Sequence, residues 1–521
     1  MGIEAHCVEL ENPYERARIA FEELVTELSS LKSHELTNSD LETLIHQDGF
    51  EIMRLLLQGH LDERGPSETL SPVVNSVGTV LPYKRERGRW LESIFGRIWV
   101  NRMGYEAKGE RVLCPLDGDL NLPKEVYSLG VRKRVASEAV KNSFDEVVAS
   151  ISTTTGAHVP KRQSEQLVAR ASIDFEAFYD QDLAIPESEV SSPVLVLSVD
   201  GKGVVMREED LRKETQKAAQ KRKQKLASKL SKGEKKGKKR MATVASVYSI
   251  EPFERTPEQL EATVMQRLRL VEPKRPRPEQ KRVWASLQKG PKEVIGEVFD
   301  EALRRDPNQQ KQWIALVDGN KTQLDLLEDY ARTYSIGLTI ILDLMHVLSY
   351  LWKAAHAFFP EGSQESEQWV SERLLRLLHG KASSVAGGIR RSATMQGLSK
   401  TQRKPVDKCA DYLLKNQKFL DYETYLTQGF PICSGVIEGT CRHLINDRMD
   451  LTGARWRLTG AEAVLKLRSL YASGDLEDYW KFHEQQEQQR NHASRYAEKK
   501  LPRLQKPHDS NTIHRHLNLV K

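Results

Sequence analysis

The amino-acid sequence predicts an α/β protein, with one mixed sheet at its centre and a large helical insertion. Short runs of Val, Ile and Leu at 194–200, 313–318 and 338–343 are typical of strands covered on both faces. The second and third runs are separated by a segment with apolar residues at helical spacing. Residues 345–430 are again helical in pattern, and this interval is longer than a strand-to-helix connection requires.

Length and composition limit the class of protein. The chain has 521 residues, which is enough for roughly three or four domains. No apolar run approaches the roughly 20 residues that span a bilayer, and the N-terminus has no signal-peptide pattern. Five cysteines without a CxxC pair argue against a disulfide framework and against a zinc ribbon. We therefore expect a cytoplasmic protein.

The N-terminal part divides by pattern into a helical region at 1–66 and a small β-rich region at 67–127. In the first, SDLETLIHQDGFEIMRLLLQGHLDERG begins with a Ser/Asp cap and repeats Leu and Ile at helical spacing. In the second, RIWVNRMGY and similar segments alternate β-forming residues with turn residues. We expect helical structure in the first region, followed by a small antiparallel sheet in the second.

A second helical region, 128–187, contains a helix, a short Thr/Gly turn and another helix. Lys161, Arg162 and Gln163 lie at the start of the second helix. In a helix-turn-helix, that position contacts base edges in the major groove of DNA. A plain helical hairpin has the same sequence pattern, so a DNA-binding role and a purely structural role both stay open.

The central sheet is predicted to begin after a linker near residue 188 and to occupy 188–344. We predict five strands, in chain order 194–200, 203–207, 241–250, 313–318 and 338–343. The first three form a hairpin-joined triplet, and 251–293 covers the sheet edge with a helix and loops. This order is typical of a ribonuclease H-like mixed sheet, in which the first and fourth strands are neighbours.

Two aspartates end strands of this sheet, because Asp200 and Asp318 each follow an apolar run and precede a glycine. Neighbouring first and fourth strands place their carboxylates side by side. Glu438, early on a helix that Ser434 could cap, would reach them from 431–485. Three carboxylates that converge repel one another unless a cation joins them, and two Mg²⁺ or Mn²⁺ ions would provide phosphodiester chemistry.

Asp343 competes with Asp318 for the second position, because it also ends a strand. We prefer Asp318, since the fifth strand lies one step further from the first. Asp343 and His346 are three residues apart and therefore adjacent on one helical face. They are interpreted either as a helix cap with an ordinary histidine, or as support for the metal ligands or a DNA contact.

A strongly basic segment, 211–240, interrupts the sheet with fourteen basic and two acidic residues. It is interpreted as a solvated loop, as a phosphate-binding arm that gains affinity by releasing counterions, or as both. The candidate DNA contacts in it are Lys221, Arg222, Lys223, Lys235, Lys236, Lys238, Lys239 and Arg240.

The sequence after Glu438 contains a second cationic group, in which Arg448, Arg455 and Arg457 lie near Trp456. Arginine beside tryptophan can hold a phosphate or stack on a base. A core tryptophan with solvated arginines gives the same pattern, and we favour DNA contact. Residues 486–521 are rich in Gln, Arg and His and are predicted to form a polar, poorly ordered tail.

Several motifs in the chain resemble one family. SVDGKGVVMR, ALVDGN, ILDLMHVLSYLWKAAHAF, CSGVIEGTCRHLINDRM and GARWRLTGAEAVLKLRSL are similar to those of the ISKra group of bacterial insertion-sequence transposases. The N-terminal FGRIWVNRMGY, CPLDGDLNLP and PKRQSEQLVARASIDFEAFY also resemble that group. These transposases are of the DDE type, with a ribonuclease H-like catalytic domain. The resemblance covers most of the chain.

The resemblance implies a metal-dependent transposase that acts on the ends of its own mobile element. By motif, Asp200, Asp318 and Glu438 match the DDE acids. Asp343 and His346 match the Asp form of a Cys/Asp–His pair that often opens the helical insertion in Mutator-like and related transposases. The implied partner is double-stranded DNA, held by a homodimer or larger assembly in the bacterial nucleoid.

Two other functions remain compatible with the sequence. A ribonuclease H-like nuclease or junction resolvase would use the same metal ions without strand transfer. A non-catalytic DNA-binding protein derived from a transposase would need no metal. A strand-transfer assay with pre-cleaved ends separates the first from a transposase, and a role that survives Asp200→Ala would favour the second.

Overall fold

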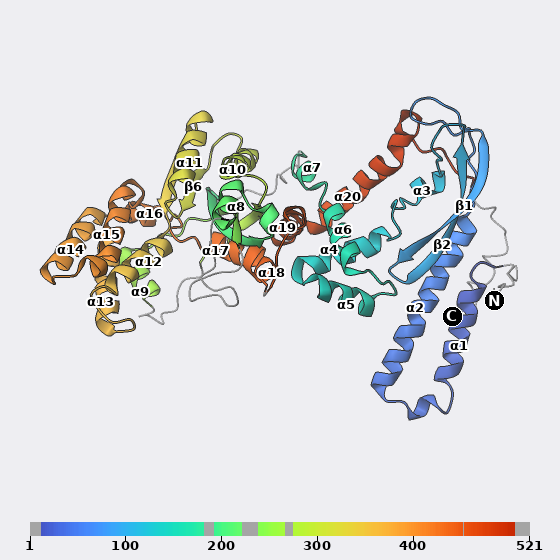
Figure 1. Cartoon of the computed structure of the whole chain (residues 1–521), viewed down its shortest axis with the longest axis horizontal. Coiled ribbons are helices and arrows are strands. Elements are labelled where there is room, and N and C mark those ends of the chain that lie inside the picture. The colour runs from blue at the N-terminus through green and yellow to red at the C-terminus, as the bar shows by residue number, and fades with distance from the viewer. Residues whose placement is uncertain (1–11, 182–191, 221–237, 266–274, 452, 506–521) are drawn as a thin grey trace. The chain divides into compact units, whose positions relative to one another are not determined.

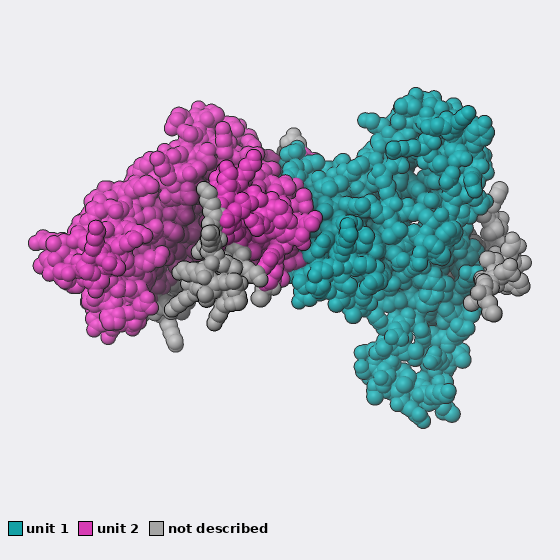
Figure 2. All heavy atoms as spheres, viewed as in Figure 1, with its two compact units in different colours: residues 1–180, 477–521 teal, residues 181–476 magenta. Residues whose placement is uncertain are grey.

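The computed structural model describes residues 12–181, 192–220, 238–265, 275–451 and 453–505. The chain forms two compact units, which Figure 2 shows in teal and magenta. Unit 1 contains residues 1–180 and 477–521, and unit 2 contains 181–476. Unit 1 is therefore built from both ends of the chain. Among the described helices, none is long and apolar enough to cross a membrane.

Unit 1 begins with two long helices that pack on a β-hairpin (Figure 1). Helices α1 (Glu15–Leu28) and α2 (Asn38–Arg64) contact each other, and α2 also packs on β2. Strands β1 (Tyr83–Ser93) and β2 (Gly96–Glu106) pair in antiparallel register. The N-terminal region is therefore helical and is followed by an antiparallel pair of strands, and the division into two packed helices is a detail that the sequence pattern did not predict.

Three helices of unit 1 pack against one another. They are α4 (Leu129–Lys141), α5 (Phe144–Thr154) and α6 (Lys161–Ala171), and the short helices α3 (Pro115–Asp119) and α7 (Phe175–Tyr179) precede and follow them. Ser143 and Glu146 form a capping box that starts α5. Helices α5 and α6 are the helix pair predicted at 128–187.

The C-terminal part of unit 1 corrects the predicted tail. Helix α20 (Leu476–Asn491) packs here through buried polar contacts, including the hydroxyl of Tyr479, which donates to the Ala171 carbonyl at 2.6 Å. Beyond it, Leu504 pairs with Thr69. Residues 486–505 are thus packed, and 506–521 lie outside the described residues. The inward face of α20 carries His483 and other polar side chains, so it shows no apolar periodicity.

The centre of unit 2 is a five-stranded mixed sheet in the order β5-β4-β3-β6-β7. The strands are β3 (Val194–Met206), β4 (Lys238–Ile250), β5 (Glu279–Ser286), β6 (Gln312–Val317) and β7 (Leu338–Leu342). β3, β4 and β5 pair antiparallel, whereas β6 and β7 run parallel to β3. The first of these strands, β3, lies beside the fourth, β6, as the sequence predicts.

The three strands that pair antiparallel are not the three that the sequence predicted. Residues 194–200 and 203–207 were expected to be two strands joined by a tight turn, but β3 runs through the glycines, with Gly201 opposite Thr243. A glycine lacks the side chain that resists either conformation, so GKG fits an extended strand as well as a turn. The third position is taken by β5, inside the segment expected to contain a helix and loops.

Helices cover the sheet of unit 2. Five consecutive residues of β6 are buried, and successive strand residues point to opposite faces, so both faces are covered. Helix α10 (Pro291–Arg305) packs on β3 and β4, α11 (Lys321–Thr333) packs on α10 and β6, and α19 (Leu458–Ser473) packs on β5. Helix α8 (Lys213–Gln220) contacts β4.

The helical insertion lies between β7 and α17 (Gly435–Cys441). It consists of α12 (Leu344–Ala355), α13 (Gln364–Leu378), α14 (Ala382–Met395), α15 (Lys400–Lys415) and α16 (Tyr422–Thr427). Helix α9 (Pro257–Val264) packs on α13. A π-helical turn, Arg442–Asn446, and the short α18 (Asp447–Met449) follow α17.

Candidate carboxylate site

Asp200 and Asp318 lie at the same level on neighbouring strands. The last parallel pair between β3 and β6 joins Ser198 to Leu316. Continuing that register by two residues places Asp200 opposite Asp318. Neighbouring strands lie about 5 Å apart, so the backbones that carry these two carboxylates are close. β3 continues past this point, whereas β6 has already ended. Asp200 therefore lies inside β3, at a position that β6 no longer flanks.

Asp343 extends the same row by one strand. The last pair between β6 and β7 joins Val317 to Leu342, and the Asp343 amide donates to the Val317 carbonyl at 2.8 Å. Continuing the register by one residue places Asp343 opposite Asp318. The three aspartates therefore form a row across β3, β6 and β7, with Asp318 in the middle.

Helix α17 crosses from one end of this row to the other. At its start, the Ser434 amide donates to Asp343 Oδ1 at 2.8 Å. At its end, the thiol of Cys441 donates to Asp200 Oδ2 at 3.2 Å. Ser434 occupies the N-cap position as predicted, but its side chain makes no capping hydrogen bond. Glu438 lies between the two anchoring contacts, on a helix that packs on β3 and β4.

The electrostatics of Glu438 identify its neighbours. Burial raises the pKa of this carboxyl, and the negative charges of Asp343 and Asp200 raise it further. The positive charges of His346 and Lys202 act in the opposite direction. Glu438 is thus close to the two outer aspartates of the row, and the local charge is predominantly negative.

Asp318 and Asp343 differ in how their oxygens are used. Asp343 is buried and accepts three backbone N–H groups, from Met345, His346 and Ser434. Asp318 is half-buried, and its Oδ1 accepts a single hydrogen bond, from the Asn320 amide at 2.9 Å. Asp343 therefore acts as a structural anchor here, whereas Asp318 keeps most of its acceptor capacity.

The helical insertion reaches the site through aromatic side chains. The Tyr412 hydroxyl on α15 donates to the Asp318 carbonyl at 2.8 Å. The Tyr412 ring stacks on Tyr350 of α12, with centroids 4.1 Å apart, and His346 lies against both rings. Burial and then the charge of Asp318 raise the pKa of Tyr412, so its hydroxyl stays protonated and can donate. The insertion thus holds the loop that follows β6.

The acidic site suits magnesium in its donor type and charge. Its donors are carboxylate oxygens, and the pKa of Glu438 is raised first by burial and then by the negative charges of Asp343 and Asp200, which a divalent cation would offset. Within the described part of the chain, no three His, Cys, Asp or Glu side chains are gathered closely enough to hold an ion as they stand. Magnesium commonly uses one or two carboxylates with water and phosphate oxygens, so a closed protein cage is not required.

The predicted helix-turn-helix residues lie at an accessible helix start. Lys161, Arg162 and Gln163 are exposed at the beginning of α6. Lys161 forms an ion pair with Asp145 of α5 at 2.7 Å, and both side chains are more than half exposed. Such a surface pair contributes little to stability, and it leaves the helix start open to a ligand.

The basic arm lies largely outside the described residues, which include none of 221–237. Lys221, Arg222, Lys223, Lys235 and Lys236 fall in that gap. Of the remaining candidates, Lys238, Lys239 and Arg240 belong to β4. Lys239 contacts Asp450 at 3.3 Å, and Arg240 donates to the carbonyls of Leu287 and Asp210, which gives Arg240 a structural role.

Arg448 and Trp456 correct the prediction of a DNA-contacting surface. Arg448 is 2% exposed and lies over the Trp456 ring at 4.9 Å. Trp456 is 8% exposed, and its backbone pairs with the end of β3. Both are core residues as the structure stands, because the tryptophan fills the edge beside β3. Arg455 and Arg457 are exposed and stay available to a ligand.

Two residues of the site were missed from sequence. Cys441 binds the Asp200 carboxylate, and Tyr412 holds the loop of Asp318. Cys441 lies within the motif that contains Glu438, but nothing in the sequence assigned it a role, because each of the two residues acts through a contact between segments far apart in the chain. The spacing of Cys441 three residues after Glu438 was the one available signal, because it places both on the same side of a helix.

Comparisons with known proteins add little to this geometry. No protein-family model matches the chain, and no curated protein sequence matches it. Among solved structures, the chain is similar to one described as the Drosophila P element transposase strand transfer complex. The TM-score is 0.23 at 8% sequence identity, over 74% of this chain and 84% of that one. A TM-score this low carries no argument about fold or function.

Proposed function

We propose that the chain is a DDE transposase, which cleaves DNA at the ends of its mobile element and joins them to target DNA. The observation that carries this proposal is the row of three aspartates with Glu438 held against it by α17. A cluster of carboxylates at one edge of a sheet is suited to metal-assisted phosphoryl transfer. The motif resemblance to ISKra-group transposases supports the same function.

The sheet supports a ribonuclease H-like catalytic domain. In that fold the first and fourth strands are neighbours, as β3 and β6 are here. The parallel pairing brings the ends of β6 and β7 to the level of Asp200. Strand order therefore brings the backbones of Asp200 and Asp318 to the same level of the sheet, although more than a hundred residues separate the two in sequence.

Within this proposal, Asp200, Asp318 and Glu438 hold the metal ions. When bound, two Mg²⁺ ions would activate the attacking oxygen and stabilise the leaving oxygen of the phosphodiester. The Gly201 amide and the Cys441 thiol orient the Asp200 carboxylate, at 2.6 and 3.2 Å. Asp343 anchors α17 and so sets the position of Glu438.

Substitution of the acids tests the proposal. Asp200→Asn, Asp318→Asn and Glu438→Gln should each reduce Mg²⁺-dependent cleavage of DNA carrying the element ends by at least about a thousandfold, because each removes a charged ligand. DNA binding, followed by electrophoretic mobility, should change little. Asp145→Asn, an exposed acid of unit 1, is the matched control and should retain full cleavage.

The same cleavage assay decides whether Asp318 or Asp343 is the second acid. If Asp318 is the second acid, Asp318→Asn loses cleavage, whereas Asp343→Asn keeps a measurable fraction of it. The reverse pattern would transfer the role to Asp343. Cleavage without joining of pre-cleaved ends would favour a nuclease or resolvase, and full activity of the Asp200→Asn variant would leave a non-catalytic DNA-binding protein.

A further inference from the structure

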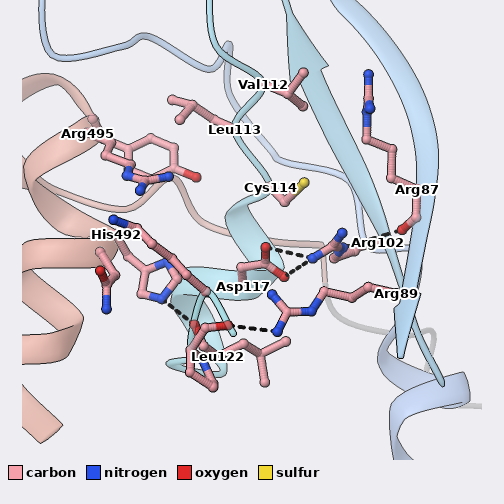
Figure 3. A pocket seen from close by; sticks show the side chains of 14 residues that line it. Arg87, Arg89, Arg102, Val112, Leu113, Cys114, Asp117, Leu122, His492 and Arg495 are labelled. Atoms are coloured by element: carbon pink, nitrogen blue, oxygen red, sulfur yellow. Dashed lines mark hydrogen bonds and ion pairs between the residues drawn. The ribbon is translucent and has the colours of Figure 1, made fainter. Parts of the chain in front are cut away.

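Unit 1 contains a cationic pocket that plays no part in the carboxylate site. It is a cavity of about 320 Å³ beside the β1–β2 hairpin, closed on its other side by residues that follow α20 (Figure 3). A volume near 300 Å³ is the lower end of the range for small-molecule sites. Its cationic lining residues are Arg87, Arg89, Arg102, Lys124 and Arg495.

The charge of the pocket is strongly positive. Five cationic side chains line it against a single carboxylate, Asp117. That carboxylate is already bound, because Arg102 donates to both of its oxygens at 2.8 Å (Figure 3). Arg87 is paired outside the lining with Glu106 at 2.7 Å, yet its buried Nε has no hydrogen-bond partner within the described residues.

Two arginines of the pocket have no carboxylate partner. Arg89 is half-buried and donates to main-chain carbonyls alone, those of Pro123 and Glu125. Arg495 makes no side-chain hydrogen bond or ion pair with any part of the chain that the structure describes. A half-buried guanidinium without an anion is costly unless a ligand or water meets its donors.

The other polar groups of the pocket are neutral near pH 7. Burial raises the pKa of the Cys114 thiol and of the Tyr496 phenol, so both stay protonated. Burial lowers the pKa of His492, whose Nε2 donates to the Leu122 carbonyl at 2.8 Å. The positive charge therefore comes from guanidinium and ammonium groups, which keep it at every physiological pH.

We propose that this pocket binds a phosphate group. Several guanidinium forks around one cavity match the oxygens of a phosphate, which accepts paired N–H donors. Arg87 and Arg89 alternate on one face of β1, and Arg87 lies opposite Arg102 on β2, so three arginines of the lining come from one surface of the hairpin. The phosphate could belong to a free nucleotide or to a DNA backbone, and these sources share the same recognition chemistry.

The proposal does not depend on the transposase function, because none of the acidic residues of unit 2 takes part. Its test is binding to the full chain, with Arg495→Gln as the first variant, since the Arg495 side chain makes no hydrogen bond or ion pair with the described residues and its loss should leave the fold intact. Arg89→Gln is the second variant. The matched control is Arg16→Gln, an exposed arginine of α1 that is far from the pocket in sequence and has no ion pair within the described residues.

Three probes distinguish the sources of the phosphate: inorganic phosphate, ATP and a 20-base-pair duplex, measured by calorimetry and fluorescence anisotropy at low salt. We expect each pocket variant to weaken at least one probe by about tenfold, because one charge-assisted hydrogen bond is lost. Weakening of the duplex alone identifies a DNA phosphate. Weakening of ATP or inorganic phosphate identifies a free ligand. Equal binding by the wild type and both variants, or no binding of any probe by the wild type, overturns the proposal.

Discussion

At the scale of single residues, buried charges in this protein are held by partners from distant parts of the chain. Asp174 is 5% exposed and accepts from His483 at 2.7 Å and from both terminal nitrogens of Arg490, at 2.8 and 2.9 Å. Burial alone would raise the pKa of Asp174, but these hydrogen bonds outweigh it and lower the pKa to about 2. The contact fixes α20 onto the N-terminal part of unit 1.

The lowered pKa of Asp174 gives a pH dependence with a definite sign. A carboxyl whose pKa is lower in the folded state stabilises the fold above its ordinary pKa of 3.8, and this contribution is lost as the pH falls towards 2. Asp174→Asn should therefore reduce the free energy of unfolding by roughly 2 kcal/mol at pH 7. The difference from wild type should shrink between pH 4 and 2.

Urea unfolding of unit 1 at several pH values, followed by tryptophan fluorescence, measures this effect. Asp145→Asn is the control, because its ion pair with Lys161 is exposed on both sides and contributes little. A constant difference between the Asp174 variant and wild type from pH 7 to pH 3 would show that the carboxylate charge is not what holds α20.

Sequence reasoning found the acids of the candidate site and missed their supports. Asp200 and Asp318 were recognised because a buried strand leaves an apolar run before the carboxylate. Glu438 was recognised from its motif, and the helix that carries it was predicted from a possible capping residue. Cys441 and Tyr412 were not recognised, since their contacts depend on how the insertion and α17 fold back on the sheet.

At the scale of elements, the apolar pattern predicted the strands whose buried residues form a continuous apolar run. The three apolar runs became β3, β6 and β7. β5 was missed because Pro and Arg residues surround it, and the split of β3 arose because Gly201 fits a turn and a strand equally well. The predicted tail begins at residue 486, inside α20 (Leu476–Asn491), because much of the buried face of that helix is polar.

Asp343 links the end of β7 to the start of α17, and its substitution is expected to loosen that helix. Asp343→Ala removes the acceptor of three backbone N–H groups and leaves the buried Ser434 amide unpaired, at a cost of about 3 kcal/mol. Asp343→Asn keeps one acceptor oxygen and should cost about 1 kcal/mol. The start of α17 should therefore loosen in the alanine variant and hold in the asparagine variant.

Hydrogen–deuterium exchange of peptides covering Gly435–Cys441 measures this loosening directly. We expect faster exchange in Asp343→Ala than in Asp343→Asn or wild type. Asp318→Ala is the matched control, since it loses one hydrogen bond, from the Asn320 amide, and the Asp318 side chain has no hydrogen bond to α17 among the described residues. Equal exchange in all four proteins would mean that Asp343 does not anchor the helix.

At the scale of the whole molecule, positive charge is distributed unevenly over the sequence. The net charge is +6, yet 211–240 alone carries fourteen basic residues against two acidic ones. In the structure, α8 takes up 213–220 and β4 begins at Lys238. A deletion of 211–240 would therefore damage the sheet that holds Asp200, so the charge of the arm is better tested within 221–237.

Neutralising the eight basic residues of 221–237 as Gln or Ser, at unchanged length, keeps α8 and β4 intact and removes the charge of the arm. If these side chains contact DNA, the dependence of binding on salt should flatten by about 0.9 in the slope of log K against log salt for each phosphate no longer neutralised. Anisotropy titrations of a labelled duplex at several salt concentrations measure the slope.

A variant with the same seventeen residues in scrambled order keeps the charge and should keep the wild-type slope. The same slope in the neutral variant would leave DNA binding to other surfaces, first among them the exposed start of α6, because counterion release counts the charges in contact and not those merely present in the chain.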